Sequence, residues 1–170
     1  SIPEALDIQQ NFEFETCVDY GCAKGFLVHA LRIIGCDAYG EDISEYAVEN
    51  CHPGVKPYIT LPNDKKYDLL ICKDVLEHIE VEDIPGVLDT FREKADQFFF
   101  SIPLGDDDRF RIREYEVDIT HVTKKDEEWW INMFESHGLK LEKFSYSFGS
   151  IKEKWIGPYP YGNGFFVLSK

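Results

Sequence analysis

Two short and continuously apolar runs constrain the fold of this chain more than any other feature. Residues 67–74 read YDLLICKD and residues 97–103 read QFFFSIP. A strand with one solvated face alternates apolar and polar residues, whereas these runs are typical of strands that are buried on both faces. Between them, residues 84–95 carry apolar side chains at helical spacing. A buried strand, a helix and a second buried strand indicate a parallel sheet covered by helices.

The rest of the chain repeats this alternation of strands and helices. Thr123 and Asp126 have the spacing of a capping box, at the start of a helix that ends near Gly138. The order of elements predicts an α/β three-layer sandwich around a mainly parallel sheet. Further strands are predicted at residues 16–20, 37–44, 57–60, 139–148 and 164–170, and further helices at residues 25–35 and 45–50.

Composition excludes several classes of protein. A chain of 170 residues with 44% hydrophobic residues is typical of one globular domain, and no composition shift marks a domain boundary, so we predict a single domain over residues 1–170. We find no apolar run long enough to span a membrane and no signal-peptide pattern in SIPEALDIQQ. The odd number of cysteines, without a CxxC pair, predicts free thiols and a cytoplasmic location: Cys17, Cys22, Cys36, Cys51 and Cys72.

The charge of the chain disfavours nucleic acid as a partner. The formal net charge is -14, and a field of that sign repels a phosphate backbone. One local exception is RFRIR, in which Arg109, Arg111 and Arg113 follow an acidic run. Their alternate spacing has two interpretations: a row of guanidinium groups that bind an anionic acceptor, or a solvated edge that balances the acidic run.

Residues 18–25, VDYGCAKG, form a glycine turn between the first predicted strand and a helix. A dinucleotide fingerprint that starts at Gly21 fails at Ala23 and Phe26, and a P-loop fails because no GK[ST] is present. Asp42, at the end of the second predicted strand, can accept hydrogen bonds from the two hydroxyls of a ribose. Asp19, just before the turn, favours a ligand that carries a cationic group. Together these features predict a site for a nucleoside that has no pyrophosphate.

Three stretches in this order, VDYGCAKGFLVHAL, YGEDISEYAV and YDLLICKDVLEHI, resemble class I S-adenosylmethionine-dependent methyltransferases, most closely their small-molecule O-methyltransferase branch. The resemblance covers residues 16–148. It implies a Rossmann-like αβα sandwich whose seven-stranded sheet is mostly parallel with an antiparallel last strand, and S-adenosylmethionine as the cofactor. The residues that it implies for cofactor binding are Asp19, Tyr20, Gly21, Ala23, Gly25, Asp42, Ile43 and Lys73. Alanine at position 23, where many members have glycine, is compatible with the turn if its φ is negative.

The chain lacks the motifs of two classes of methyltransferase, which excludes their methyl acceptors. The [ND]PP[YF] turn of enzymes that methylate nucleobase amino groups is replaced by KDVL, and no cysteine follows a proline as in cytosine-C5 enzymes. We therefore expect transfer to a hydroxyl oxygen of a small molecule, with a sugar, nucleotide-linked or phosphorylated acceptor. The expected catalytic residues are His121, with Asp118 as the carboxylate that orients its ring, and His78.

Two alternatives stay open. Asp74, Glu77, His78 and His121 resemble the metal-binding ExxEH…H set of RNA 2′-O-methyltransferases, although DVLEH also occurs in relatives that need no metal. We expect no metal, and metal-assisted methylation of RNA is the first alternative. The second is a methyltransferase-like module that binds S-adenosylmethionine without catalysis.

Overall fold

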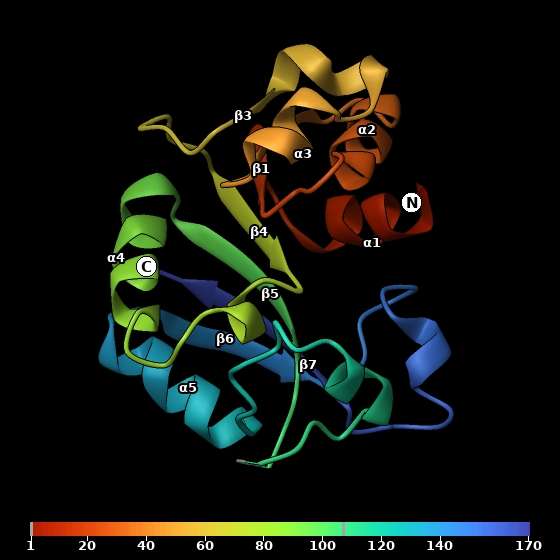
Figure 1. The fold of residues 1–170 in the computed structure, drawn as a ribbon. Helices are drawn as coiled ribbons and strands as arrows, with labels where there is room; N and C mark the ends of the chain where they lie inside the picture. Colours follow the sequence, from red (N-terminus) through yellow and green to blue (C-terminus); the bar gives the residue numbers. More distant parts are fainter. Residues whose placement is uncertain (1, 107) are drawn as a thin grey trace.

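The computed structural model describes residues 2–106 and 108–170. Its strands are β1 (Thr16–Tyr20), β2 (Asp37–Glu41), β3 (Ile59–Thr60), β4 (Leu69–Lys73), β5 (Gln97–Pro103), β6 (Lys140–Ser145) and β7 (Asn163–Ser169). They form one sheet in the order β3-β2-β1-β4-β5-β7-β6 (Figure 1). The pairs from β3 to β5 are parallel, and β7 runs antiparallel to both of its neighbours. The predicted seven-stranded sheet with an antiparallel last strand is confirmed.

Helices cover both faces of the sheet, which gives the predicted three layers (Figure 1). Helices α1 and α2 pack on one face, and helices α4 and α5 pack on the other. The helices are α1 (Ile2–Asn11), α2 (Phe26–Ile33), α3 (Glu45–Glu49), α4 (Ile84–Lys94) and α5 (Glu127–Ser136). Short 3₁₀ turns lie at Pro53–Tyr58, Leu76–His78, Arg113–Val117 and Glu153–Trp155.

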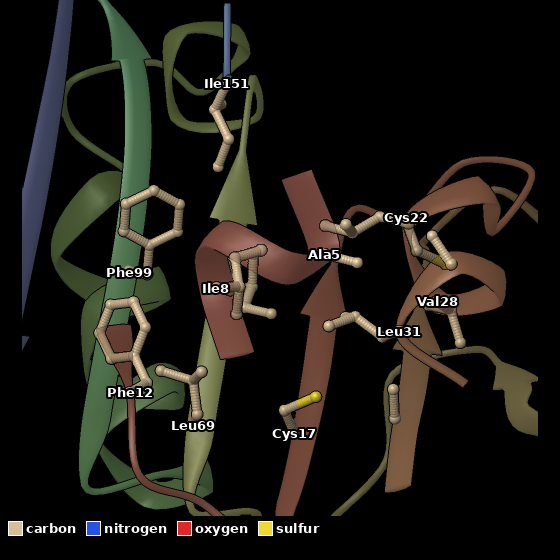
Figure 2. Close-up of a cluster of buried hydrophobic side chains, with 14 of the residues drawn as sticks. Ala5, Ile8, Phe12, Cys17, Cys22, Val28, Leu31, Leu69, Phe99 and Ile151 are labelled. Atoms are coloured by element: carbon tan, nitrogen blue, oxygen red, sulfur yellow. The ribbon is translucent and has the colours of Figure 1, made fainter. Parts of the chain in front are cut away.

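Successive side chains of the central strands point to opposite faces, so each strand supplies two cores. On β5, Phe99 packs with α1 and α2, whereas Phe98 and Phe100 pack with α4 and α5. Figure 2 shows the first of these cores, in which Ala5 and Ile8 of α1 lie over the sheet. Two-sided burial explains why the runs of β4 and β5 are continuously apolar.

Two helix starts differ from the sequence-based expectation. Helix α1 was not predicted, because its ten residues place only Ala5 and Ile8 in the core. The capping box was wrong: Asp126 itself caps α5, and its carboxylate accepts a hydrogen bond of 2.8 Å from the Trp129 amide. The Thr123 hydroxyl donates instead to the carbonyl oxygen of Ile79, at 2.6 Å.

The predictions about cysteine and membrane segments can be compared directly with the structure. All five cysteines are free, and four of them are buried, as the sequence predicts. Among residues 2–106 and 108–170, no helix has the length and hydropathy of a membrane span.

A buried ion pair joins the end of β2 to α4. The Lys94 ammonium lies 2.9 Å from a carboxylate oxygen of Glu41, and the Glu41 side chain is fully buried. Lys94 also donates to the carbonyl oxygen of Asn63. Burial raises the pKa of Glu41, and the hydrogen bond from Lys94 opposes that rise. Because removal of one partner leaves a buried charge without compensation, this pair makes the position of the β2 terminus sensitive to mutation.

We expect Lys94→Met to lower the free energy of unfolding by about 3–5 kcal/mol, because it leaves the buried Glu41 carboxylate without its cationic partner. The double variant Glu41→Gln/Lys94→Met should recover part of this loss. Lys140→Met is the control, because it breaks the exposed pair with Glu142 and should cost less than about 1 kcal/mol. Urea denaturation of the three variants measures these differences. Equal effects of Lys94→Met and Lys140→Met would contradict the assignment.

Candidate functional site

Three cavities lie side by side at the carboxyl ends of β1, β2 and β4. The turn cavity, of about 480 Å³, lies over the turn after β1. The apolar cavity, of about 390 Å³, lies between that turn and the end of β2. The loop cavity, of about 620 Å³, lies between the end of β4 and the connection from β6 to β7. Asp74 lines all three, and Gly21 lines the first two. Ligands of open α/β sheets bind at this edge.

The turn after β1 is built from left-handed backbone. Gly21 and Gly25 have φ values of 77° and 74°, and Ala23 has a φ of 47°. The condition under which alanine was expected to suit this turn, a negative φ, is therefore not met. An amide hydrogen bond of 2.8 Å to Asp42 holds Ala23 in this conformation. Gly25 faces away from the cavities, because a side chain there would meet Val55 and Ile59.

Asp19 and Lys73, two members of the predicted cofactor set, line the turn cavity. Burial raises the pKa of Asp19 to about 7, while the charge of Lys73 opposes the shift. The Lys73 ammonium forms an ion pair of 2.8 Å with Glu4 of α1. The unpredicted helix α1 thus contributes a charged side chain to this cavity.

The apolar cavity contains three more members of the predicted cofactor set: Tyr20, Asp42 and Ile43. The Asp42 carboxylate accepts one backbone hydrogen bond on each oxygen, from Ala23 at 2.8 Å and from Ser44 at 2.9 Å. Each oxygen retains a lone pair for a further donor. Val75, Ile79 and Val87 complete the apolar wall, and His78 also lines this cavity.

Most residues of the loop cavity lie outside the sequence motifs. Besides Lys73 and Asp74, it is lined by Glu4, Tyr115, Ser150, Lys152, Glu153, Lys154 and Trp155. Lys152 is largely buried and pairs its ammonium with the Asp74 carboxylate. It also donates a hydrogen bond of 2.9 Å to Asn163, the first residue of β7. No motif marks these residues, since a lone lysine in a loop carries no spacing signal.

Of the three predicted catalytic residues, His78 lines the apolar cavity, whereas His121 and Asp118 belong to the lining of none of the three cavities. The Nδ1 atom of His121 lies 2.7 Å from the Tyr115 carbonyl oxygen, and its Nε2 atom lies 3.8 Å from Asp118. Asp118 is exposed and bonds mainly to Thr120, whose hydroxyl donates to it at 2.6 Å. The His78 and His121 rings are 4.5 Å apart between centroids. Burial, followed by the proximity of His121, lowers the pKa of His78.

Glu77 is a buried carboxylate next to this histidine pair. Neither of its carboxylate oxygens has a hydrogen-bond partner among residues 2–106 and 108–170. Burial, reinforced by the charge of Asp74, raises the pKa of Glu77 to about 8. Ligand atoms of Glu77, His78 and His121 all lie within 4.8 Å of one another. Three members of the alternative metal set are therefore together, while Asp74 is paired with Lys152.

The arginine series does not form a row at a binding site. Arg111 is held by ion pairs to Asp106 and Glu127, at 3.0 and 2.8 Å. Arg109 and Arg113 are exposed and do not line the loop cavity. The interpretation as an edge that balances neighbouring acids therefore holds for Arg111.

Comparison with known proteins gives the same family as the sequence motifs. The chain matches the family model described as a methyltransferase domain over residues 2–143. No curated protein matches it. Among solved structures it is similar to the mitomycin 7-O-methyltransferase MmcR, with 17% identity, 100% of this chain and 54% of that chain covered, and a TM-score of 0.73. The chain thus spans about half the length of MmcR.

Two other solved structures share the fold. One is magnesium protoporphyrin IX methyltransferase (ChlM) from Synechocystis PCC 6803 with bound SAH, with 17% identity and a TM-score of 0.69. The match covers 99% of this chain and 80% of ChlM. The other is the small RNA methyltransferase HEN1, with 16% identity and a TM-score of 0.72. The match covers 99% of this chain and 24% of the HEN1 chain. Because the family match extends over most of the chain, this protein belongs to the methyltransferase domain family and its cofactor is S-adenosylmethionine.

Proposed function

We propose that this protein transfers the methyl group of S-adenosylmethionine to a hydroxyl oxygen of a small-molecule acceptor. The observation that carries the proposal is the meeting of three cavities at Asp74. Two of them suit the two ends of the cofactor, and the third adjoins both. A methyl donor and an acceptor could thus be held on opposite sides of one residue.

The described residues fit the cofactor. Buried Asp19 suits the cationic amino group at the methionine end, in the turn cavity. Asp42 suits the ribose hydroxyls, and Ile43 with Val75 provides apolar surface for the adenine in the apolar cavity. Because Gly21 borders both cavities, it lies where the two parts of the cofactor would join. When bound, S-adenosylmethionine supplies an electrophilic methyl group on a sulfonium centre.

The chain has to orient the acceptor and accept its proton. Methylation of a hydroxyl oxygen releases the hydroxyl proton, which a base of the chain would have to accept. We retain His121 as the predicted base, with His78 beside it. Asp118 lies 3.8 Å from the Nε2 atom of His121, so the Tyr115 carbonyl orients the ring in place of the predicted Asp118. Support comes from the Tyr115 carbonyl, which fixes the Nδ1 atom of His121 and leaves its Nε2 atom to accept a proton.

The charge of the protein and its free thiols support a small acceptor and a reducing compartment. A net charge of -14 disfavours nucleic acid. The five free cysteines fit the cytoplasm. MmcR and ChlM carry names of small-molecule methyltransferases on the same fold. Cofactor binding without methyl transfer to any acceptor would instead favour the non-catalytic alternative.

We expect Gly21→Ala to weaken S-adenosylmethionine binding at least about tenfold, or about 1.4 kcal/mol. A Cβ atom at Gly21 would overlap Val75, which lines the apolar cavity. Gly35→Ala is the matched control, because Gly35 also has a positive φ, of 92°, but a Cβ there has no neighbour within 4 Å. Isothermal titration calorimetry measures both affinities. Wild-type protein that does not bind the cofactor would refute the proposed function.

Asp19 makes cofactor affinity dependent on pH. Its carboxyl is neutral below its pKa of about 7 and charged above it. Since the cationic amino group of the cofactor requires the charged form, affinity should rise roughly tenfold between about pH 6 and 8. Asp19→Asn should bind more weakly at the higher pH and lose this Asp19-linked rise. Titrations of both proteins in matched buffers test this, and the same pH profile in both would exclude Asp19.

The Glu77 cluster favours a second candidate function, metal-assisted methylation. The Nδ1 atoms of both histidines are occupied, by Thr120 at 2.9 Å for His78 and by the Tyr115 carbonyl for His121. Such contacts leave Nε2 for a metal and orient the ring, as in many metal sites. A cation bound by these residues would polarise the acceptor hydroxyl. The fold shared with HEN1 extends this candidate to RNA, which the net charge disfavours.

The metal candidate predicts saturable binding of one Mn²⁺ or Zn²⁺ ion per protein, as measured by calorimetry. His121→Ala should weaken that binding at least about tenfold, because a three-ligand site loses one ligand. His137→Ala is the control, since His137 lies at the end of α5 and contacts Met133. Absence of binding to the wild-type protein, or equal loss in both variants, would remove metal from the mechanism.

A further inference from the structure

The topology brings the connection between β6 and β7 to the functional edge. Strand β6 is parallel to β5, so it ends at Ser145 on the same edge as β5, and antiparallel β7 begins there at Asn163. Residues 146–162 must therefore lie at the carboxyl ends of the parallel strands. This segment supplies Ser150, Lys152 and Trp155 to the loop cavity, among others.

Two sets of contacts hold this connection in place. Asp7 of α1 accepts hydrogen bonds of 2.6 Å from both the amide and the hydroxyl of Ser150. On the other side, Lys152 pairs with Asp74, and both residues have a φ of 56°, in the left-handed region. Non-glycine residues in this conformation are uncommon and cluster at functional sites. These contacts hold Ser150, Lys152 and Asp74 in the wall of the loop cavity.

The lining of the loop cavity is chemically distinctive. Among the residues that the structure describes, its nine lining side chains include no aliphatic one. Three lysines face three carboxylates, and the lining also contains one serine hydroxyl. Tyr115 and Trp155 supply two aromatic rings with centroids 6.2 Å apart. Sites for apolar ligands are lined predominantly by hydrophobic side chains, so this cavity is unsuited to an apolar acceptor.

The charges of the lining also disfavour an anionic acceptor. Lys73 is paired with Glu4, and Lys152 is paired with Asp74. The lysine and carboxylate charges of the lining balance, so an incoming phosphate would not meet an excess of positive charge. Arg111, which could have supplied such charge, is held by two acids elsewhere.

We propose that the loop cavity is the acceptor site and binds an uncharged, polyhydroxylated ring, such as a pyranoside. This inference rests on the proposed function and narrows its acceptor. The hydroxyls of such a ring can donate to carboxylates and accept from ammonium groups, while its C–H face packs on an aromatic ring. The volume of about 620 Å³ lies within the range of small-molecule sites.

Asp74 lies next to the position proposed for the reacting hydroxyl, because it borders the two cavities proposed for the cofactor as well as the loop cavity. The predicted base His121 does not line the loop cavity, but its ring lies 5.2 Å from that of Tyr115, which does. Lys152 acts through Asp74: its ammonium holds the carboxylate, and Asn163 holds the ammonium. Lys152 is therefore a positioning residue for the acceptor.

The test uses the indole N–H resonance of Trp155 in ¹⁵N-labelled protein saturated with S-adenosylhomocysteine. The chain has three tryptophans, and Trp155→Phe assigns the signal. Methyl α-glucopyranoside, methyl α-mannopyranoside and methyl α-rhamnopyranoside are the neutral probes, with glucose 6-phosphate and catechol as competitors. We expect at least one neutral pyranoside to shift the resonance saturably, and the two competitors to leave it unchanged. A shift by a competitor alone, or by no probe, would overturn the inference.

Variants separate recognition from folding. In saturation-transfer measurements, Trp155→Ser should reduce binding of the responsive pyranoside at least about fivefold, whereas Trp155→Phe should retain it. Lys152→Met should reduce pyranoside binding as Trp155→Ser does. Lys140→Met, which breaks an exposed ion pair on β6, should bind the pyranoside as well as the wild type does. Equal binding by Trp155→Ser and wild type would also overturn the inference. Calorimetry of the wild-type protein with S-adenosylhomocysteine distinguishes the two proposals. If the wild type does not bind this cofactor product, the proposed function is refuted. If it binds the cofactor product but no pyranoside, only this inference is refuted.

Discussion

Two-sided burial of the central parallel strands is the constraint on which the rest of this structure depends. Because β1, β4 and β5 are covered by helices on both faces, their chemistry is confined to the strand ends. Parallel strands bring their carboxyl ends to one edge, so Gly21, Asp42 and Asp74 come together although they are far apart in the chain. The three cavities follow from this arrangement.

Asp74 connects the parts of the proposed site. It follows β4 directly, has a left-handed backbone, and pairs with a lysine from the far end of the chain. Helix α1 acts similarly from the other terminus, through the contact of Glu4 with Lys73 and that of Asp7 with Ser150. Helix α1 and the connection between β6 and β7 thus enclose a proposed site whose central residue, Asp74, lies near the middle of the sequence.

Local patterns predicted the residues that depend on local structure. The glycine turn, the strand-end acid Asp42 and the DVLEH segment are short stretches whose geometry is set by the strand and helix on either side. Asp19 lines the turn cavity, and Tyr20, Asp42 and Ile43 line the apolar cavity. Failures arose where conformation depends on distant partners. Ala23 adopts a positive φ because Asp42 accepts its amide hydrogen bond, and Thr123 bonds to Ile79 rather than capping α5.

The sequence by itself determined the α/β class, the mostly parallel sheet and the family, because hydrophobic periodicity and a contiguous turn are properties of neighbouring residues. Only the tertiary structure decided which residues line the loop cavity. The loop cavity draws on α1, the end of β4, the Arg113–Val117 turn and the connection between β6 and β7. Its partners, such as Lys152 and Asp74, are joined by sheet topology rather than by spacing, and an ion pair between distant residues leaves no periodic signal in a single sequence.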